Sequence, residues 1–95
     1  MDLVWLPRAR QERRSQITYI ASRHPAAALE VGLRLRAAVE NLTLFPDAGR
    51  PGRIPGTREL VIADTPLVAI YRVDEKREEV QILRILHARQ KYPPE

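Results

Sequence analysis

Residues 57–93 read TRELVIADTPLVAIYRVDEKREEVQILRILHARQKYP. The stretch contains three short apolar runs, and turn-forming residues separate them at 64–66 and at 74–78. Apolar and β-branched runs of this length between such residues are typical of antiparallel strands. The spacing therefore predicts three strands, near 57–63, 67–73 and 79–87.

The last of these runs is largely apolar on both of its faces. Two-residue alternation places Val80, Ile82, Arg84 and Leu86 on one face and Gln81, Leu83, Ile85 and His87 on the other. A strand that is apolar on both sides is typical of the middle of a sheet. We therefore expect it to be central, with Arg84 reaching the rim or lining a groove on the open face.

The N-terminal half predicts one strand and two helices. An apolar run over 2–6 before Pro7 indicates a short strand, and residues 8–22 follow with a thin apolar stripe typical of a partly buried helix. A second helix begins at Pro25, which suits a first helical position, and ends before Pro46 and Gly49. Its expected buried face is Ala28, Val31, Leu35, Ala38, Val39, Leu42 and Phe45.

Only His24 and Pro25 separate the two helices, which favours an antiparallel hairpin. Residues 47–56 are rich in proline and glycine and are expected to form a loop. The order of elements predicts an α+β fold: a short N-terminal strand, a two-helix hairpin and a three-stranded antiparallel meander, with the helices on one sheet face. We expect Trp5 and Tyr71 to belong to the core.

Length and composition limit the function. Ninety-five residues are enough for a single domain, 1–95, and the absence of cysteine excludes disulfides and thiolate catalysis. No apolar stretch could span a bilayer, and the N-terminus lacks the pattern of a signal peptide, so we expect a cytoplasmic protein without a membrane partner. The net charge is +4, and arginine supplies fourteen of the sixteen basic residues. Arginine suits pairing with carboxylates and phosphates, so the expected partner is nucleic acid or an acidic protein segment.

The positions of the charges say more than their sum, because an arginine-rich composition also arises from a GC-rich genome. Arg8, Arg10, Arg13 and Arg14 lie within seven residues, and Arg50, Arg53 and Arg58 lie within nine residues that hold no acidic side chain. An ordinary solvated helix face is the alternative interpretation of the first cluster.

The meander and tail add a second group of polar residues: Arg58, Arg72, Arg84, His87, Arg89, Lys91 and Tyr92. Cleavage of RNA by its 2′-hydroxyl needs a base, an acid and cations for the phosphorane. His87 could act as the base or acid, Arg58 and Arg89 could hold the phosphate, and Tyr92 could stack on a base. The alternative is that His87 bonds the backbone and locks the tail. Two histidines without further ligands do not predict a metal site, and we expect no cofactor.

Several motifs together resemble the RelE/ParE superfamily of type II toxin–antitoxin toxins. They are the Arg-Ala-Arg start of the first helix with 19–21 near its end, 45–46, 50–52, 57–60, 71–73 and the run 82–87. The resemblance implies a growth-inhibiting toxin that forms a hetero-oligomer with a cognate antitoxin, whose extended or helical C-terminal segment wraps and neutralises it. RelE-like members cut mRNA on the ribosome, and ParE-like members poison DNA gyrase.

Departures from the RelE-like cleavage set favour the ParE-like branch. Val68 stands where that set has an arginine, Leu60 stands where it has a lysine, and Tyr92 is a loose match. Arg58, His87 and Arg89 would be catalytic only in the alternative, a ribosome-dependent endoribonuclease. A third possibility is a nontoxic basic binding module. We expect the target or antitoxin to contact Arg8, Arg10, Arg13, Arg14, Arg50, Arg53, Arg72, Arg84, Lys91 and Tyr92.

Overall fold

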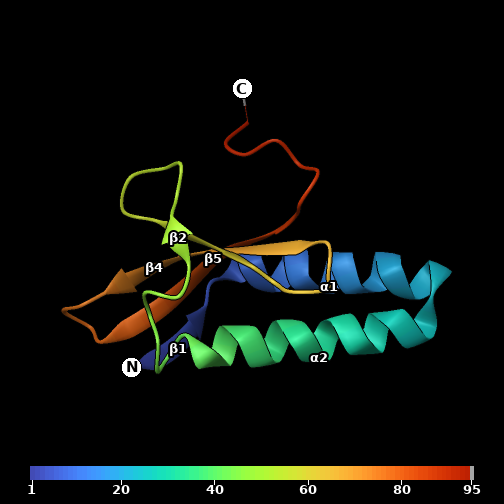
Figure 1. Ribbon diagram of the computed structural model, residues 1–95, viewed down its shortest axis with the longest axis horizontal. Coiled ribbons are helices and arrows are strands. Elements are labelled where there is room, and N and C mark those ends of the chain that lie inside the picture. Colours follow the sequence, from blue (N-terminus) through green and yellow to red (C-terminus); the bar gives the residue numbers. More distant parts are fainter. Residues whose placement is uncertain (95) are drawn as a thin grey trace.

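The computed structural model describes residues 1–94 and contains two helices and a five-stranded sheet (Figure 1). In chain order the elements are β1 (Asp2–Trp5), α1 (Pro7–Arg23), α2 (Pro25–Asn41), β2 (Arg50–Pro51), β3 (Arg58–Val61), β4 (Leu67–Asp74) and β5 (Glu79–His87). The sheet order is β1-β5-β4-β3-β2, in which β1 runs parallel to β5 and the other pairs are antiparallel. The predicted α+β class, helical hairpin and meander are confirmed, as is the central position of β5.

Two features of the sheet were not predicted from sequence. The expected loop at 47–56 contains the two-residue strand β2, which pairs with β3. The N-terminal strand β1 extends the sheet beside β5, so that the predicted meander is part of a larger mixed sheet. Together these strands pair with part of each outer edge of the meander, residues 79–82 of β5 and residues 58–59 of β3.

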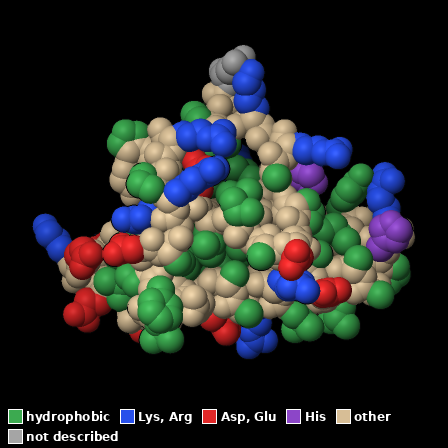
Figure 2. Space-filling model, viewed as in Figure 1, with side chains coloured by type: hydrophobic (Ala, Val, Ile, Leu, Met, Phe, Trp, Pro, Cys, Tyr) green, Lys and Arg blue, Asp and Glu red, His purple; other side chains and the backbone are tan. Residues whose placement is uncertain are grey.

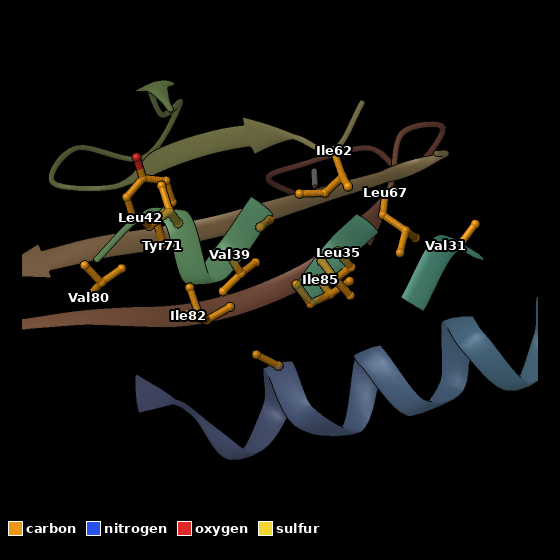
Figure 3. Close-up of a cluster of buried hydrophobic side chains, with 12 residues drawn as sticks. Val31, Leu35, Val39, Leu42, Ile62, Leu67, Tyr71, Val80, Ile82 and Ile85 are labelled. Atoms are coloured by element: carbon orange, nitrogen blue, oxygen red, sulfur yellow. The ribbon is translucent and has the colours of Figure 1, made fainter. Parts of the chain in front are cut away.

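The core lies between α2 and one face of the sheet. Figure 3 shows side chains of α2 directed toward side chains of β4 and β5. The fully buried members include Leu35, Leu42, Tyr71, Ile82 and Ile85, each at most 1% exposed. The predicted buried face of α2 is therefore confirmed up to Leu42. Phe45 was wrongly predicted as buried and is 60% exposed. The helix ends at Asn41, so helical spacing no longer places Phe45 on the buried face.

Tyr71 is the largest fully buried side chain and connects the sheet to the loop after α2. Its hydroxyl donates to the Pro46 carbonyl at 2.7 Å and accepts the Gly49 N–H at 2.8 Å. A Cβ on Gly49 would lie 2.7 Å from the Tyr71 ring, so only glycine permits this close approach. Burial raises the pKa of the Tyr71 hydroxyl, which keeps it protonated as a donor.

A β-bulge in β5 overturns the simple alternation expected for that strand. Ile70 pairs with Arg84 and Tyr71 pairs with Ile82, which leaves Leu83 as the inserted residue. The insertion places Ile85, instead of Arg84, in the core row with Ile82. Arg84 therefore lies in the same row as Ile70, on the sheet face turned away from α2, which we call the outer face.

Candidate functional site

The outer face of the sheet is covered in part by the C-terminal tail, residues 88–94. The Ala88 N–H donates to the Pro66 carbonyl at 2.7 Å, and the Gln90 side chain accepts the His87 N–H at 2.7 Å. Between tail and sheet lies a hollow of about 150 Å³. It brings together four of the predicted site residues, Arg50, Arg53, His87 and Tyr92. Figure 2 shows lysine and arginine side chains gathered around this tail and the loop before β3.

A carboxylate that was not predicted to take part occupies the wall of this hollow. Glu59 of β3 is 4% exposed, accepts a hydrogen bond from Arg50 Nη2 at 3.0 Å and another from the Arg53 N–H at 3.1 Å. Burial alone would raise the pKa of Glu59, but these hydrogen bonds and both guanidinium charges outweigh it and lower the pKa. Glu59 is therefore ionised at neutral pH and offsets the positive charge of the hollow.

Arg53 and Arg84 hold the tail against the sheet. Arg53 Nη1 donates to the Tyr92 carbonyl at 2.6 Å, and the Arg84 guanidinium lies 5.8 Å from the centre of the Tyr92 ring. Arg84 is itself fixed by Glu12 of α1, whose carboxylate it meets at 2.9 Å. Both Arg84 and Tyr92 thus stabilise the fold, whatever else they contact.

His87 is the last residue of β5, and one of its ring nitrogens accepts a hydrogen bond from the backbone. Its Nδ1 accepts the Arg89 N–H at 3.1 Å. This is the interaction expected of a histidine that locks the tail. The Arg89 side chain is exposed.

Arg58 does not join His87 in the hollow. Side chains alternate between the two faces of β3, so Arg58 and Glu59 lie on different faces. Arg58 shares its face with Leu60, which packs on the core. Its Nη1 donates to the Gly49 carbonyl at 2.8 Å, and its Nη2 lies 3.4 Å from Asp47. The structure therefore separates Arg58 from His87, whereas Arg89 stays beside His87 at the end of β5.

The remaining predicted residues are distributed over the surface. Arg72 is exposed and donates through Nε to the Gln81 side chain, and Lys91 is an exposed residue of the tail. The cluster on α1 is solvent-exposed at Arg8, Arg10, Arg13 and Arg14.

The four arginines of this cluster divide into two pairs. The Arg13 guanidinium stacks 4.9 Å from the centre of the Trp5 ring, and both Arg13 and Arg14 line a groove between α1 and α2. Arg8 and Arg10 lie outside that groove. The chain thus carries cations over two separate hollows, one under the tail and one on the helical hairpin.

Neither a metal centre nor a membrane span emerges from the described part of the chain. Within residues 1–94 the carboxylates and histidines form no group of three that could hold a metal ion. Neither helix of this range has the length and apolar character needed to cross a bilayer.

Comparisons with known proteins cover almost the whole chain. The family model of the ParE toxin of the type II toxin–antitoxin system parDE matches residues 3–92. A candidate toxin of Sinorhizobium fredii, Y4kP, is 42% identical over 94% of this chain and 90% of its own length. Toxin RelE2 of Caulobacter vibrioides is 34% identical, over 92% of this chain and 94% of its own length.

Solved structures that resemble this chain also come from toxin–antitoxin systems. A chain of the chromosomal ParDE toxin–antitoxin system of P. aeruginosa superposes with a TM-score of 0.80 at 30% identity, covering 92% of this chain and 95% of that one. A chain of the toxin–antitoxin complex RelBE2 of Mycobacterium tuberculosis has a TM-score of 0.59 at 21% identity, over 90% of this chain and 88% of that one, and shares the fold.

Proposed function

We propose a target for this chain from the premise that it belongs to the family of ParE toxins of type II toxin–antitoxin systems. The chain is a type II toxin, and its structural relatives come from toxin–antitoxin systems. Our proposal is that it inhibits growth by binding DNA gyrase, that it catalyses no reaction itself, and that a cognate antitoxin neutralises it. Because gyrase acts on the chromosome, the proposal places the toxin in the cytoplasm.

The observation that carries the choice of gyrase is that the predicted cleavage residues do not converge, because Arg58 lies outside the hollow that contains His87. RNA cleavage requires a base, an acid and phosphate-binding cations around one phosphate. Arg58 lies on the opposite face of β3, and His87 Nδ1 accepts a backbone N–H. Glu59 adds a buried negative charge to the hollow where the phosphate would have to bind. These placements favour a protein target over a bound RNA.

One observation supports RNA cleavage as a second candidate. Arg50, Arg53, His87 and Tyr92 do share a hollow, and these residue types could bind and stack on a nucleotide. An endoribonuclease built there would use Arg50 and Arg53 in place of Arg58. It would have to overcome the charge of Glu59, which both arginines already contact.

The two candidates predict different changes in cells. The chain is induced alone and together with the product of its adjacent gene, and growth and the supercoiling of a reporter plasmid are followed. We expect arrest with relaxed plasmid when the chain is alone, and normal growth with its neighbour. Unchanged growth in both cultures would contradict a toxin. Arrest with normal supercoiling and codon-positioned mRNA cuts would select the endoribonuclease.

A further inference from the structure

The turn that follows α2 exposes two large apolar side chains next to each other. Leu44 is 74% exposed and Phe45 is 60% exposed, so that Leu44 is the most exposed large apolar side chain within residues 1–94. Both line an open hollow of about 520 Å³, whose other lining residues are Asn41, Pro46, Asp47 and Ala48. Adjacent apolar side chains exposed in this way are typical of a binding surface.

Hydrogen bonds within the turn fix the positions of these two side chains. The Leu44 and Phe45 N–H groups both donate to the Asn41 carbonyl, at 3.1 and 3.0 Å. The Ala48 N–H donates to the Phe45 carbonyl at 3.1 Å. Leu42, at the start of the turn, is fully buried in the core. The exposed pair therefore stands on a turn that is anchored at its beginning.

Two residues of the sheet hold the rest of the turn. The Tyr71 hydroxyl bonds to the Pro46 carbonyl and the Gly49 N–H, as described above. Arg58 donates to the Gly49 carbonyl at 2.8 Å and lies 3.4 Å from Asp47. A surface that is ordered before its partner arrives loses less conformational entropy on binding. The turn thus has the rigidity expected of a docking surface.

The charges around this hollow differ from those of the two cationic hollows. None of the described residues that line it is lysine or arginine, whereas arginines line both the hollow under the tail and the groove between α1 and α2. Asp47, whose side chain is 86% exposed, also lines an adjoining hollow of about 280 Å³ that reaches Glu75. Figure 2 shows acidic side chains gathered at the left of the view, where Figure 1 places the β4–β5 turn.

This combination of apolar and acidic groups selects the kind of partner. Nucleic acid or an acidic protein segment would be repelled by Asp47 and Glu75. A second copy of the chain would bring the same carboxylates together, which disfavours a symmetric contact. A basic protein surface with an apolar depression is complementary. An enzyme that binds DNA presents basic surfaces to the phosphates, and gyrase is such an enzyme.

We infer that this turn patch, defined by Leu44, Phe45, Pro46, Asp47 and Ala48, binds a basic, apolar-lined surface of DNA gyrase. Leu44 and Phe45 insert into the apolar depression, and Asp47 meets basic side chains at its rim. The inference rests on the proposed inhibition of gyrase and adds the surface through which the toxin makes that contact. It also gives Arg58 a role, because its contacts with Gly49 and Asp47 hold the patch.

The test measures the concentration of purified chain that halves supercoiling by purified gyrase. Phe45→Ala removes the aromatic ring and should raise this concentration at least about tenfold. Leu44→Lys and Leu44→Glu remove the same apolar side chain and add opposite charges. Against a basic surface, Leu44→Lys should raise the concentration at least about tenfold, and at least about threefold more than Leu44→Glu.

Tyr19 provides the matched control. It is an aromatic residue of α1 that is 56% exposed, close to Phe45, and it lies near the connection between the helices, at the other end of α2 from the turn. Tyr19→Ala and Tyr19→Lys should stay within about twofold of the unmodified chain. All variants should keep their thermal unfolding midpoint and their complex with the product of the adjacent gene. The two Leu44 variants change a largely exposed side chain, so they decide the question if Phe45→Ala does not fold.

The outcomes separate the turn patch from the proposed function. Inhibition by Phe45→Ala and Leu44→Lys at the concentration of the unmodified chain would overturn the patch alone. Equal losses with Leu44→Lys and Leu44→Glu would contradict a basic partner. Loss of the complex with the adjacent gene product in the same variants would assign the patch to that protein and also contradict the inference. Gyrase that stays active with the unmodified chain would overturn both the patch and the proposed target.

Discussion

Arg84 of β5 donates hydrogen bonds through two guanidinium nitrogens to the carboxylate of Glu12 on α1. Arg84 Nε lies 2.9 Å from Glu12 Oε1, and Arg84 Nη2 lies 2.9 Å from Oε2. Glu12 Oε1 also accepts the Ile85 N–H at 3.2 Å, on the stretch of β5 that extends beyond its pairing with β1. One carboxylate thus satisfies a strand edge and joins the helical hairpin to the sheet. It raises the pKa of Arg84 through the hydrogen bonds it accepts.

Glu12→Ala should destabilise the fold by about 2–3 kcal/mol, because it leaves the largely buried Arg84 and the Ile85 N–H without their acceptor. Urea unfolding of both single variants and of the double variant with Arg84→Ala measures the interaction. The double variant should lose less than the sum of the single losses, by more than about 1 kcal/mol. Additive losses would show that the two side chains do not stabilise each other.

Tyr71→Phe should lower the free energy of unfolding by about 1–3 kcal/mol, because the Pro46 carbonyl and the Gly49 N–H lose their buried partner. Thermal and urea unfolding measure the change. Tyr19→Phe is the matched control, since Tyr19 is 56% exposed and should be near neutral. Equal stability of Tyr71→Phe and the unmodified chain would mean that water replaces the hydroxyl.

Glu59 should make the fold sensitive to acid. Its pKa in the folded chain lies below the ordinary 4.5 because the Arg53 and Arg50 contacts outweigh the effect of burial. A carboxylate whose pKa is lower when folded stabilises the fold above its unfolded pKa and loses this contribution as the pH falls through the folded value. Glu59→Gln should therefore flatten the loss of stability below about pH 4.5. Parallel stability curves for the two proteins from about pH 6 to about pH 3 would contradict the assignment.

Arg53→Ala should loosen the tail. It removes the hydrogen bond to the Tyr92 carbonyl, and a contribution of about 1 kcal/mol corresponds to about fivefold more frequent opening. Trypsin cleavage after Lys91, followed by mass spectrometry, should accelerate by about that factor. Arg77→Ala removes an exposed arginine away from the tail and serves as the control. An unchanged cleavage rate in Arg53→Ala would contradict this prediction and show that other contacts hold the tail in place.

The elements of the fold were predictable because local signals mark them. Turn residues separate the meander strands, and the period of α2 identifies a buried face from Ala28 to Leu42. The bulge at Leu83 was not predictable, because apolar residues on both sides of β5 conceal an inserted residue. The pairing of β1 with β5 and the Glu12–Arg84 contact join residues more than seventy positions apart, and nothing in a single sequence records such a pairing.

The candidate site was predictable in composition and less so in geometry. The hollow brings Arg50 and Arg53 from one expected cluster together with His87 and Tyr92 from the other. Alternation along β3 sets Arg58 on the face of Leu60, opposite Glu59, which lines the hollow. The burial of Glu59 between two arginines depends on how the loop after α2 folds back, which sequence patterns do not specify. Leu29 and Leu33 of α2 are exposed and line the groove between α1 and α2.

One experiment compares the two possible targets of the toxin directly. Purified chain is added to DNA gyrase in a supercoiling assay and, in parallel, to a translation reaction in which primer extension maps breaks in the mRNA. We predict loss of supercoiling with intact mRNA, reversed by prior addition of the adjacent gene product. Active gyrase together with codon-positioned mRNA cuts that disappear in His87→Ala or Arg89→Ala would contradict it.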